Sequence, residues 1–340
     1  MLTSAPLAID AMSGDLGASA CVGGTLLALQ ALPDLRIVFT GQTRLIEPLL
    51  AGANAAIRSR ITLREASDVV AMDDAPRDAV RRKKGSSMRV AVDLVKSGEA
   101  SACVSAGNTG ALMAIAHFVL RTIEGVDRAA IISAIPSITG HTHMLDLGAN
   151  ARATGAQLAQ FAAMGNIVAR EVHGVVSPRV GLLNIGEEDS KGHEVVQEAH
   201  ALIAASGINY VGFVEGNVIF SGEVDVVVTD GFTGNVALKT MEGLAMMVRS
   251  RMREEFSRNA MTKLAGLAAS GVLRRVALSL DPGRYNGACM VGLNGVVVKS
   301  HGRADERAFA QAVKFAAHAV EQRLPGHIAA ALNRSLAERG

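Results

Sequence analysis

Short runs of apolar residues alternate, through the first two thirds of the chain, with longer stretches in which apolar residues recur every three or four positions. Most of the short runs are continuous, as expected for strands that are buried on both faces. They predict strands at Leu7–Ala11, Arg36–Thr40, Ile61–Glu65, Ser101–Ser105, Ala129–Ile135, Met144–Leu147, Val180–Ile185, Tyr210–Val214 and Val224–Thr229. The longer stretches predict helices at Ala18–Leu32, Met88–Ser97, Thr109–Arg121, Ala156–Arg170 and His193–Ala205. This alternation predicts an α/β fold with a mostly parallel sheet and helices on both faces.

The pattern changes after Gly234. Residues 235–256 predict one long helix, whereas residues 257–280 read as short amphipathic pieces that Gly266 and Gly271 separate. A last amphipathic helix is expected over Ala304–Leu324. We therefore expect a single α/β unit over residues 1–340, from which an amphipathic helical segment at 240–282 protrudes.

Apolar stripes on this protruding segment suggest what it contacts. One stripe holds Leu264 and Leu267, and another holds Leu273 and Val276 with basic residues beside it. Such a stripe suits the surface of a bilayer, and it equally suits a helical hairpin at a dimer interface. Both possibilities stay open.

Glycine-rich turns follow several of the predicted strands and open the next helix. They are Ser13–Gly17, Ser105–Gly110, Asn184–Gly186 and Asp230–Asn235. In open α/β sheets this edge binds ligands, because helix N-termini and exposed backbone N–H groups converge there. Tight turns need glycine in any α/β protein, so the argument depends on all four turns together. We expect them to line one rim of the sheet.

Composition narrows the class of protein. Of 340 residues 49% are hydrophobic, which is enough to bury a large core. Lys and Arg number 34 against 32 Asp and Glu, a net charge of +2, and aromatics are 3% with no Trp. This balance argues against a nucleic-acid partner. The three cysteines lie far apart in no C-x-x-C pair, so neither disulfides nor a cysteine zinc site is expected.

Membrane-spanning and secretory signals are also weak. The uncharged stretch from Ala100 to Leu120 is interrupted at its centre by polar and glycine residues, so it reads as a strand, a turn and a helix. No basic residue precedes Arg36, unlike a signal peptide. We expect a cytosolic protein.

Several common enzyme motifs are missing. The first strand is not followed by G-x-G-x-x-G, which weakens a dinucleotide site, and the chain has no P-loop and no G-x-S-x-G elbow. His141 and His143 lie two apart on a predicted strand and could share a metal, but a packing role is the stronger interpretation of such a pair.

The densest charge cluster precedes a predicted helix. Five basic residues fall within eight positions, namely Arg77, Arg81, Arg82, Lys83 and Lys84. Gly85, Ser86 and Ser87 follow at the start of the helix, where hydroxyl and free N–H groups would hold a phosphate or an acidic partner. A solvated surface run is the alternative.

Three further polar residues stand at the same ends of strands. Lys191 follows a predicted strand within a run of acidic residues, and it would either pair with them or place a positive charge on a substrate anion. Asn108 and Asn235 open their helices, where each could polarise a carbonyl or simply cap the helix.

A resemblance to one family runs in order from about residue 7 to residue 315. It is carried by Ala8–Met12, the Arg-Lys-Lys-x-Ser-Ser-Met run from Arg82, Ser105–Ala111, Leu145–Asn150, Gln160–Gly165, Asn184–Glu188, Asp230–Lys239 and Lys299–Gly302. Together these motifs resemble the PlsX family of bacterial phosphate acyltransferases. Three positions depart from the family pattern: Ser13 stands where a glycine is usual, Ala18 stands in place of proline, and Val218 stands where aspartate is common.

The resemblance implies transfer of a long acyl chain from acyl carrier protein to inorganic phosphate, for phospholipid synthesis. It implies a fold similar to isopropylmalate dehydrogenases and phosphotransacetylases, a homodimer, peripheral contact with the inner face of the cytoplasmic membrane, and no metal or organic cofactor.

Roles for individual residues follow as expectations. We expect Lys191, Asn235 and Asn108 to act in catalysis, and Arg77, Arg81, Arg82 and Lys83 to dock the acidic carrier protein. Phosphate or pantetheine is expected to bind at Lys84, Ser86, Ser87, Gly107, Thr109, Asp230 and Gly234. Membrane contact is expected at Leu264, Leu267, Leu273 and Val276.

Other functions stay open at this point. A short-chain phosphotransacetylase that uses coenzyme A, an NAD-dependent hydroxyacid dehydrogenase and a membrane-associated scaffold are the alternatives. The missing dinucleotide motif argues against the dehydrogenase.

Overall fold

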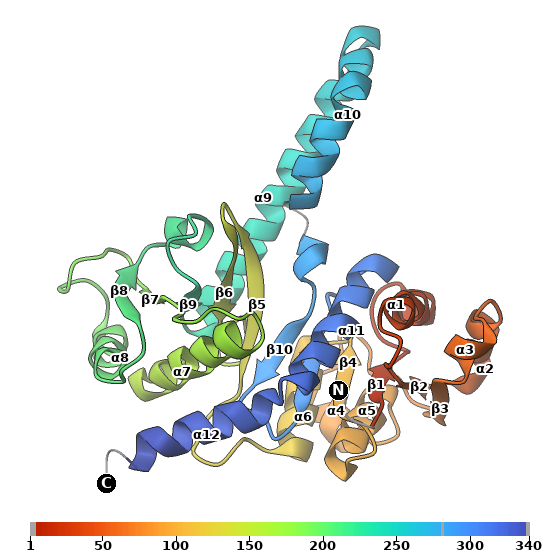
Figure 1. The fold of residues 1–340 in the computed structure, drawn as a ribbon, viewed down its shortest axis with the longest axis horizontal. Helices are drawn as coiled ribbons and strands as arrows, with labels where there is room; N and C mark the ends of the chain where they lie inside the picture. Colours follow the sequence, from red (N-terminus) through yellow and green to blue (C-terminus); the bar gives the residue numbers. More distant parts are fainter. Residues whose placement is uncertain (1–4, 280–281, 338–340) are drawn as a thin grey trace.

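An eleven-stranded sheet runs through the computed structural model, which describes residues 5–279 and 282–337 (Figure 1). The strand order is β3-β2-β1-β4-β11-β10-β5-β6-β9-β7-β8. The strands are β1 (Leu7–Asp10), β2 (Ile37–Gly41), β3 (Ile61–Glu65), β4 (Ala102–Ser105), β5 (Ala130–Ser137), β6 (Gly140–Leu145), β7 (Val180–Leu183), β8 (Tyr210–Val214), β9 (Val226–Val228), β10 (Ala288–Val291) and β11 (Val296–Lys299).

Most neighbouring strands are parallel, and the nine strands predicted from the sequence are all present. The exceptions lie at the centre, where β10 runs antiparallel to both β11 and β5, and β5 runs antiparallel to β6. The sequence pattern did not predict β10 and β11. These two short strands complete the middle of the sheet.

Helices cover both faces of this sheet, as predicted. They are α1 (Gly17–Ala31), α2 (Thr43–Ile46), α3 (Ala55–Arg58), α4 (Pro76–Arg82), α5 (Ser87–Ser97), α6 (Thr109–Leu120), α7 (Gly155–Glu171), α8 (Glu194–Ala204), α9 (Gly231–Ser257), α10 (Ala260–Ser279), α11 (Glu306–Glu321) and α12 (Leu324–Ala337), with the 3-10 turns η1 (Glu47–Leu50), η2 (Gly216–Phe220) and η3 (Pro282–Tyr285). Helices α1, α7, α8, α11 and α12 contribute to the core on one face, and α4, α5 and α6 to the core on the other.

The two cores explain why the apolar runs are continuous. In β1, Leu7 and Ile9 belong to one core whereas Ala8 belongs to the other, and all three are at most 1% exposed. Because successive side chains of a strand point to opposite faces, a sheet covered on both sides needs an apolar residue at every position.

Helices α9 and α10 project from the sheet as a hairpin (Figure 1). The expectation that residues 257–280 form short pieces is wrong, because α10 is continuous from Ala260 to Ser279. Gly266 does not interrupt it: a Cβ there would lie 2.9 Å from the Phe256 ring, so the glycine permits close contact between the two helices. This contact offsets the helix propensity cost of glycine, about 1 kcal/mol.

Within the described residues, no helix combines the length and the apolar character that crossing a membrane requires.

Candidate active site

The glycine-rich turns do not share one rim of the sheet. Strands β1, β4 and β11 are parallel to one another, whereas β6, β9 and β7 run the opposite way, because three antiparallel pairings separate the two groups. The carboxyl ends of these groups therefore lie at two edges. The turns after β1 and β4 belong to the first edge, and those after β7 and β9 belong to the second. The expectation of a single rim is wrong, because the pattern of apolar residues does not reveal that the strands between the two groups pair antiparallel.

The first edge is tightly hydrogen-bonded. Asp10 is 1% exposed, and its Oδ2 accepts from the Ser105 hydroxyl at 2.6 Å. Burial raises the pKa of Asp10, and the hydrogen bond from Ser105 opposes that shift. The Ser13 hydroxyl donates to the carbonyl of Asp10 at 2.7 Å and accepts from the N–H of Ala106 at 2.9 Å. Ser13, which replaces the usual glycine, therefore joins the ends of β1 and β4.

Lys299 is the buried cation of this edge. Its side chain is 8% exposed, and Nζ donates to the carbonyls of Ala106, at 3.3 Å, and of Ser300. Burial and then the nearby charge of Lys239 lower the pKa of Lys299 to about 8, although Asp15 and Asp10 oppose this shift. A buried ammonium beside a second cation makes a favourable place for an anion.

The second edge is organised by Asp146. Its carboxylate accepts from the backbone N–H groups of Ile131, Ala149 and Asn150, at 3.0, 3.0 and 2.7 Å. Burial raises the pKa of Asp146 and these bonds oppose the shift. The carboxylate thereby fixes the turn that follows β6.

Helix α9 begins against this turn. A Cβ at Gly234 would lie 1.9 Å from the carbonyl oxygen of Asp146, so only glycine fits this crossing. Asp230 caps the helix, because its Oδ1 accepts from the N–H of Thr233 at 2.8 Å. Asp230 and Gly234, expected to bind substrate, have structural contacts here, and their contact with substrate stays a prediction.

Lys191 and Asn235 both lie at the second edge and are exposed. Lys191 lies between β7 and α8, where its carbonyl accepts from the side-chain amide of Asn184 at 3.1 Å. Asn235 lies in the first turn of α9, and a Cβ at Gly148 would lie 3.5 Å from its side chain. Because β7 and β9 are adjacent parallel strands, their following turns bring these two residues to the same edge.

Helix α9 connects the two edges. Asn235, Lys239 and Glu242 are spaced so that they lie along one face of the helix. Asn235 lies at the second edge, whereas Glu242 Oε2 lies 3.8 Å from Nε2 of His301, which follows β11 at the first edge. Seven residues of helix span about 10 Å. The face of α9 from Asn235 to Glu242 is thus our candidate active site, and we call it the α9 face.

Charges on the α9 face are strongly coupled. Lys239 Nζ lies 2.9 Å from Glu242 Oε2. His301 and then Lys239 lower the pKa of Glu242 to about 2, so this carboxylate is charged at neutral pH. Two lysines, a histidine and a carboxylate therefore surround the junction of α9 with the end of β11.

Asn108 has no free amide hydrogen in this structure. Its Oδ1 accepts from the N–H of Ala111 at 3.0 Å, and its Nδ2 donates to the carbonyls of Met72 and Asp74 at 2.8 and 3.0 Å. It therefore caps α6 and fixes the preceding loop. A role as a donor to substrate stays a prediction and would require these bonds to break.

The serines of the basic run are buried rather than presented to a ligand. Ser86 is 0% exposed and caps α5 through the N–H of Arg89, and Ser87 is 1% exposed. Gly107 is also buried, and its N–H donates to the Ser105 hydroxyl at 3.1 Å. These three residues are buried in this conformation, and their contact with substrate stays a prediction. Lys84 and Thr109 are exposed, and their contact with substrate stays a prediction.

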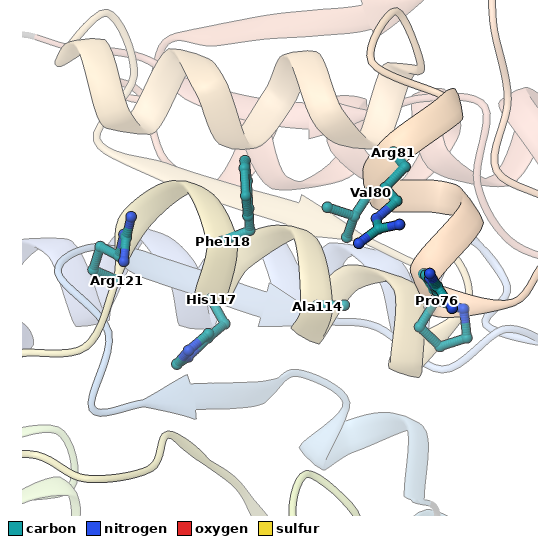
Figure 2. Close-up of a pocket in the computed structure, with 8 residues that line it drawn as sticks. Pro76, Val80, Arg81, Ala114, His117, Phe118 and Arg121 are labelled. Carbon is teal, nitrogen blue, oxygen red and sulfur yellow. The ribbon is translucent and has the colours of Figure 1, made fainter.

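The basic run divides into two parts. Arg77 and Arg81 line a pocket of about 410 Å³ between α4 and α6, together with Phe118 and Arg121 (Figure 2). Arg82 is also exposed, and its Nε lies 3.4 Å from Oδ1 of Asp78 on the same helix. Lys83 instead points inward, where its Nζ donates to Asp74 at 2.5 Å and to the carbonyl of Val69 at 2.8 Å. Lys83 is therefore engaged within the protein, which argues against its expected part in docking.

Apolar side chains of the hairpin are exposed along both helices. Leu264 and Leu267 are 69% and 71% exposed, Val276 is 45% exposed, and Leu273 is half-buried. Helix α9 adds exposed Leu244 and Met246. What contacts the exposed side chains of the hairpin is a matter for proposal.

Sequence reasoning assigned no role to Lys299, His301, Lys239 or Glu242. The signal was present in the Lys299–Gly302 and Asp230–Lys239 motifs, but β11 was not recognised as a strand. Without that strand, nothing placed Lys299 beside Ser105. Val218, where aspartate is common, lies in η2 and is 7% exposed within a core, so no carboxylate is available there.

Comparison with known proteins identifies relatives over nearly the whole chain. Residues 5–326 match the family model described as fatty acid synthesis protein. Curated proteins named phosphate acyltransferase are 50% identical in Nitrosococcus oceani, over 98% of both chains, and 52% identical in Methylococcus capsulatus, over 95% of both. The one from Alcanivorax borkumensis is 53% identical over 96% of this chain and 97% of its own.

Solved structures show the same fold at low identity. The EutD phosphotransacetylase from Staphylococcus aureus aligns with a TM-score of 0.60 at 16% identity, over 94% of each chain. A branched-chain phosphotransacylase from Enterococcus faecalis V583 aligns with a TM-score of 0.56 at 15% identity, over 92% of this chain and 98% of its own. These likenesses concern the fold alone. The motifs, the family model and relatives about half identical along their full length agree, and the chain belongs to the PlsX family of phosphate acyltransferases.

Proposed function

We propose that this chain transfers a long fatty acyl group from acyl carrier protein to inorganic phosphate, giving an acyl phosphate for phospholipid synthesis. Its family is defined by acyl transfer to phosphate, and the match to phosphate acyltransferases over 98% of the chain is the observation that carries the proposal. That acyl carrier protein donates the acyl group is proposed in addition.

The reaction needs little acid–base chemistry from the protein. An oxygen of the phosphate dianion attacks the thioester carbon, the C–S bond breaks, and the pantetheine leaves as a thiolate that takes up a proton from solvent. The nucleophile is already ionised at neutral pH and the leaving group is stable. The protein mainly has to hold two anionic partners together and stabilise the tetrahedral oxyanion.

Phosphate is proposed to bind beside Lys239 and Lys299. The charge of Lys239 lowers the pKa of Lys299, which means that the two cations repel one another when both are protonated. A dianion near both ammonium groups relieves this repulsion and favours the protonated form of Lys299. Glu242 and His301 then hold Lys239 in place on the α9 face.

Lys191 and Asn235 are proposed to act from the second edge. Both are exposed, and neither side chain has an ion pair or hydrogen bond within the described ranges. An ammonium and an amide donor at this edge would stabilise the oxyanion as it forms.

The pocket between α4 and α6 is the proposed docking surface for the carrier protein. Arg77, Arg81 and Arg121 supply positive charge, and the half-exposed Phe118 supplies apolar contact (Figure 2). Because acyl carrier protein is acidic, such a surface would speed encounter and fix orientation. Arg82, which is exposed on α4, would add to the positive field of this surface.

The exposed apolar stripes of α9 and α10 are proposed to contact a bilayer surface or a second copy of the chain in a homodimer. A product with a long acyl chain is poorly soluble in water. Release next to a membrane would therefore suit this reaction.

A donor comparison tests the function. Purified protein is supplied with orthophosphate and with palmitoyl acyl carrier protein or acetyl coenzyme A, and release of the free thiol is measured. We expect the carrier-bound donor to react with a kcat/KM at least tenfold higher, a difference of ~1.4 kcal/mol in barrier. Higher activity with acetyl coenzyme A would instead identify a short-chain phosphotransacetylase.

Two exposed lysines separate the proposed roles. Lys239→Ala is expected to raise the KM for phosphate about tenfold or more, and Lys191→Ala to lower kcat about tenfold or more. Lys263→Ala on the hairpin is the matched control, and both kinetic constants should be unchanged. Wild-type kinetics in Lys239→Ala would remove the phosphate site from the α9 face.

A further inference from the structure

We propose that His141, His143 and His173 form a binding site for one divalent transition-metal ion of the zinc class. The site lies away from the α9 face. His141 and His143 are on β6, and His173 follows the end of α7. The sequence pair alone favoured a packing role, but the structure adds a third histidine that is thirty positions further along the chain.

The three side chains converge on one point. One ring nitrogen from each lies within 4.8 Å of those from the other two. Their ring centroids are 4.8, 4.7 and 4.5 Å apart. Tetrahedral Zn²⁺ with bonds of about 2.0 Å to nitrogen needs ligand atoms roughly 3.3 Å apart. Small side-chain rotations therefore bring the three nitrogens to coordination distance.

His143 is oriented as a metal ligand. It is 3% exposed, and its Nδ1 lies 3.3 Å from the carbonyl oxygen of Asp225. A carbonyl only accepts hydrogen bonds, so the proton is on Nδ1 and the lone pair is on Nε2. This Nε2 is buried and has no hydrogen-bond partner in the described part of the chain. Metal-bound histidines commonly donate their second N–H to a backbone carbonyl in this way.

Burial differs across the cluster in a way that suits ion entry. His143 is buried, His141 is half-buried and His173 is exposed. An ion can therefore reach the site from solvent at His173, and water can supply a fourth ligand. Three imidazoles with no carboxylate among them favour Zn²⁺, with Co²⁺, Ni²⁺ and Cu²⁺ as the ions that the same ligands would accept.

Metal binding would link a strand of the sheet to a helix that packs on it. The ion would tie β6 to the segment that follows α7, next to the place where the projecting hairpin returns to the core. Tyr285 of η3 marks this place, because its hydroxyl donates to the carbonyl of Gly140 at 3.2 Å and its ring centroid is 5.6 Å from that of His141. The expected effect is therefore higher thermal stability of the full chain.

Metal titration of the full chain tests the site. Protein freed of metal with a chelator and dialysed is titrated with Zn²⁺ by calorimetry, and Co²⁺ is added separately to record its visible absorption. We expect one ion per chain with a Kd below about 10 μM, an intense tetrahedral Co²⁺ band and a higher Tm in the presence of Zn²⁺. A wild-type Kd weaker than this overturns the proposal.

His173→Ala is the informative variant, because this side chain is exposed and its removal leaves the core intact. It should weaken Zn²⁺ binding at least about tenfold and abolish the Tm increase. His193→Ala, which removes an exposed histidine elsewhere, should behave as wild type. Equal Zn²⁺ affinity in His173→Ala and wild type would show that binding is at another place, and it overturns the proposal.

Discussion

The buried side chain of Lys299 places a positive charge at the first edge of the sheet. Lys299 is almost fully buried and keeps two backbone carbonyls as its hydrogen-bond partners. Burying its charged ammonium group costs free energy, and an apolar side chain at this position would avoid that cost. We interpret that cost as the consequence of placing a cation where phosphate is proposed to bind.

Lys299→Met should change how stability depends on pH. The pKa of Lys299 is lowered to about 8 in the folded chain, whereas an unfolded lysine titrates near ~10.4. Between these two pKa values the unfolded chain binds more protons than the folded chain, so the free energy of unfolding rises with pH. Below the folded pKa, Lys299 is charged in both states, and the full cost of burying the charge lowers the stability. From about pH 7 to about pH 9.5 the wild type should gain roughly 2 kcal/mol relative to Lys299→Met.

Urea unfolding of both proteins at the two pH values, in phosphate-free buffer, measures this gain. The comparison with the variant cancels other groups that titrate in the same range. An equal stability difference at both pH values would show that Lys299 has an ordinary pKa.

Gly234→Ala should be strongly destabilising. Its Cβ would lie 1.9 Å from the carbonyl oxygen of Asp146, so α9 would have to move away from the turn after β6. We expect a loss of about 3 kcal/mol or more. Gly243→Ala on the same helix meets no atom within 4 Å and should be neutral or stabilising, by up to about 1 kcal/mol. Similar Tm values for the two variants would contradict this packing.

The sequence could predict which residues gather at strand ends but not which of them are free to act. Asn108, Ser86 and Ser87 have residue types that suit phosphate or carbonyl recognition. Each of them also suits a helix cap, and the structure shows Asn108 and Ser86 in that role. A motif cannot distinguish the two roles, because both use the same donors and acceptors at the same position of the chain.

At the scale of secondary structure, the apolar runs predicted nine strands, because most of these strands are buried on both faces. Strands β10 and β11 were missed because they follow the change of pattern after α9, where strands and helices no longer alternate along the chain. Their pairing with β5 and β4 is made by residues far away in the sequence. Strand direction, and with it the division into two edges, depends on these long-range pairings.

The α9–α10 hairpin gives a prediction for membrane contact. Leu264→Glu with Leu267→Glu places two charges on the exposed apolar stripe of α10, which should weaken binding to vesicles that contain anionic lipid by about tenfold or more. Ser270→Glu, at an exposed position of the same helix, is the control and should bind as wild type. Co-sedimentation measures binding, and size-exclusion chromatography reports the oligomeric state.

Unchanged vesicle binding by the double variant would exclude α10 as the membrane contact. If the oligomeric state changed instead, the stripe would be assigned to the homodimer interface.

At the scale of the whole molecule, the proposed functions occupy separate surfaces. The pocket between α4 and α6 is proposed to receive the carrier protein, the α9 face to bind phosphate, and the projecting hairpin to meet a membrane or a second copy. The α/β class and the sheet with helices on both faces were predicted from the sequence. The α9 face was not, since it depends on a helix that joins the two edges of the sheet.

Charge reversal at the docking pocket should act on the protein-bound donor alone. Arg77→Glu with Arg81→Glu is expected to lower kcat/KM for acyl carrier protein at least about tenfold at low salt, and less at high salt, because screening weakens the field. Stability should hardly change, since both side chains are exposed. Arg44→Glu with Arg58→Glu, on α2 and α3, is the control with the same charge change at two exposed positions. Equal losses in the two proteins would place docking elsewhere.

The most direct test of the account follows the phosphate itself. Purified protein is incubated with palmitoyl acyl carrier protein and orthophosphate labelled with ³²P, and the lipid-extractable product is counted. We expect labelled acyl phosphate in amounts equal to the carrier protein released, and no release when phosphate is omitted. Release of carrier protein without phosphate, or with no label in the acyl product, would contradict it.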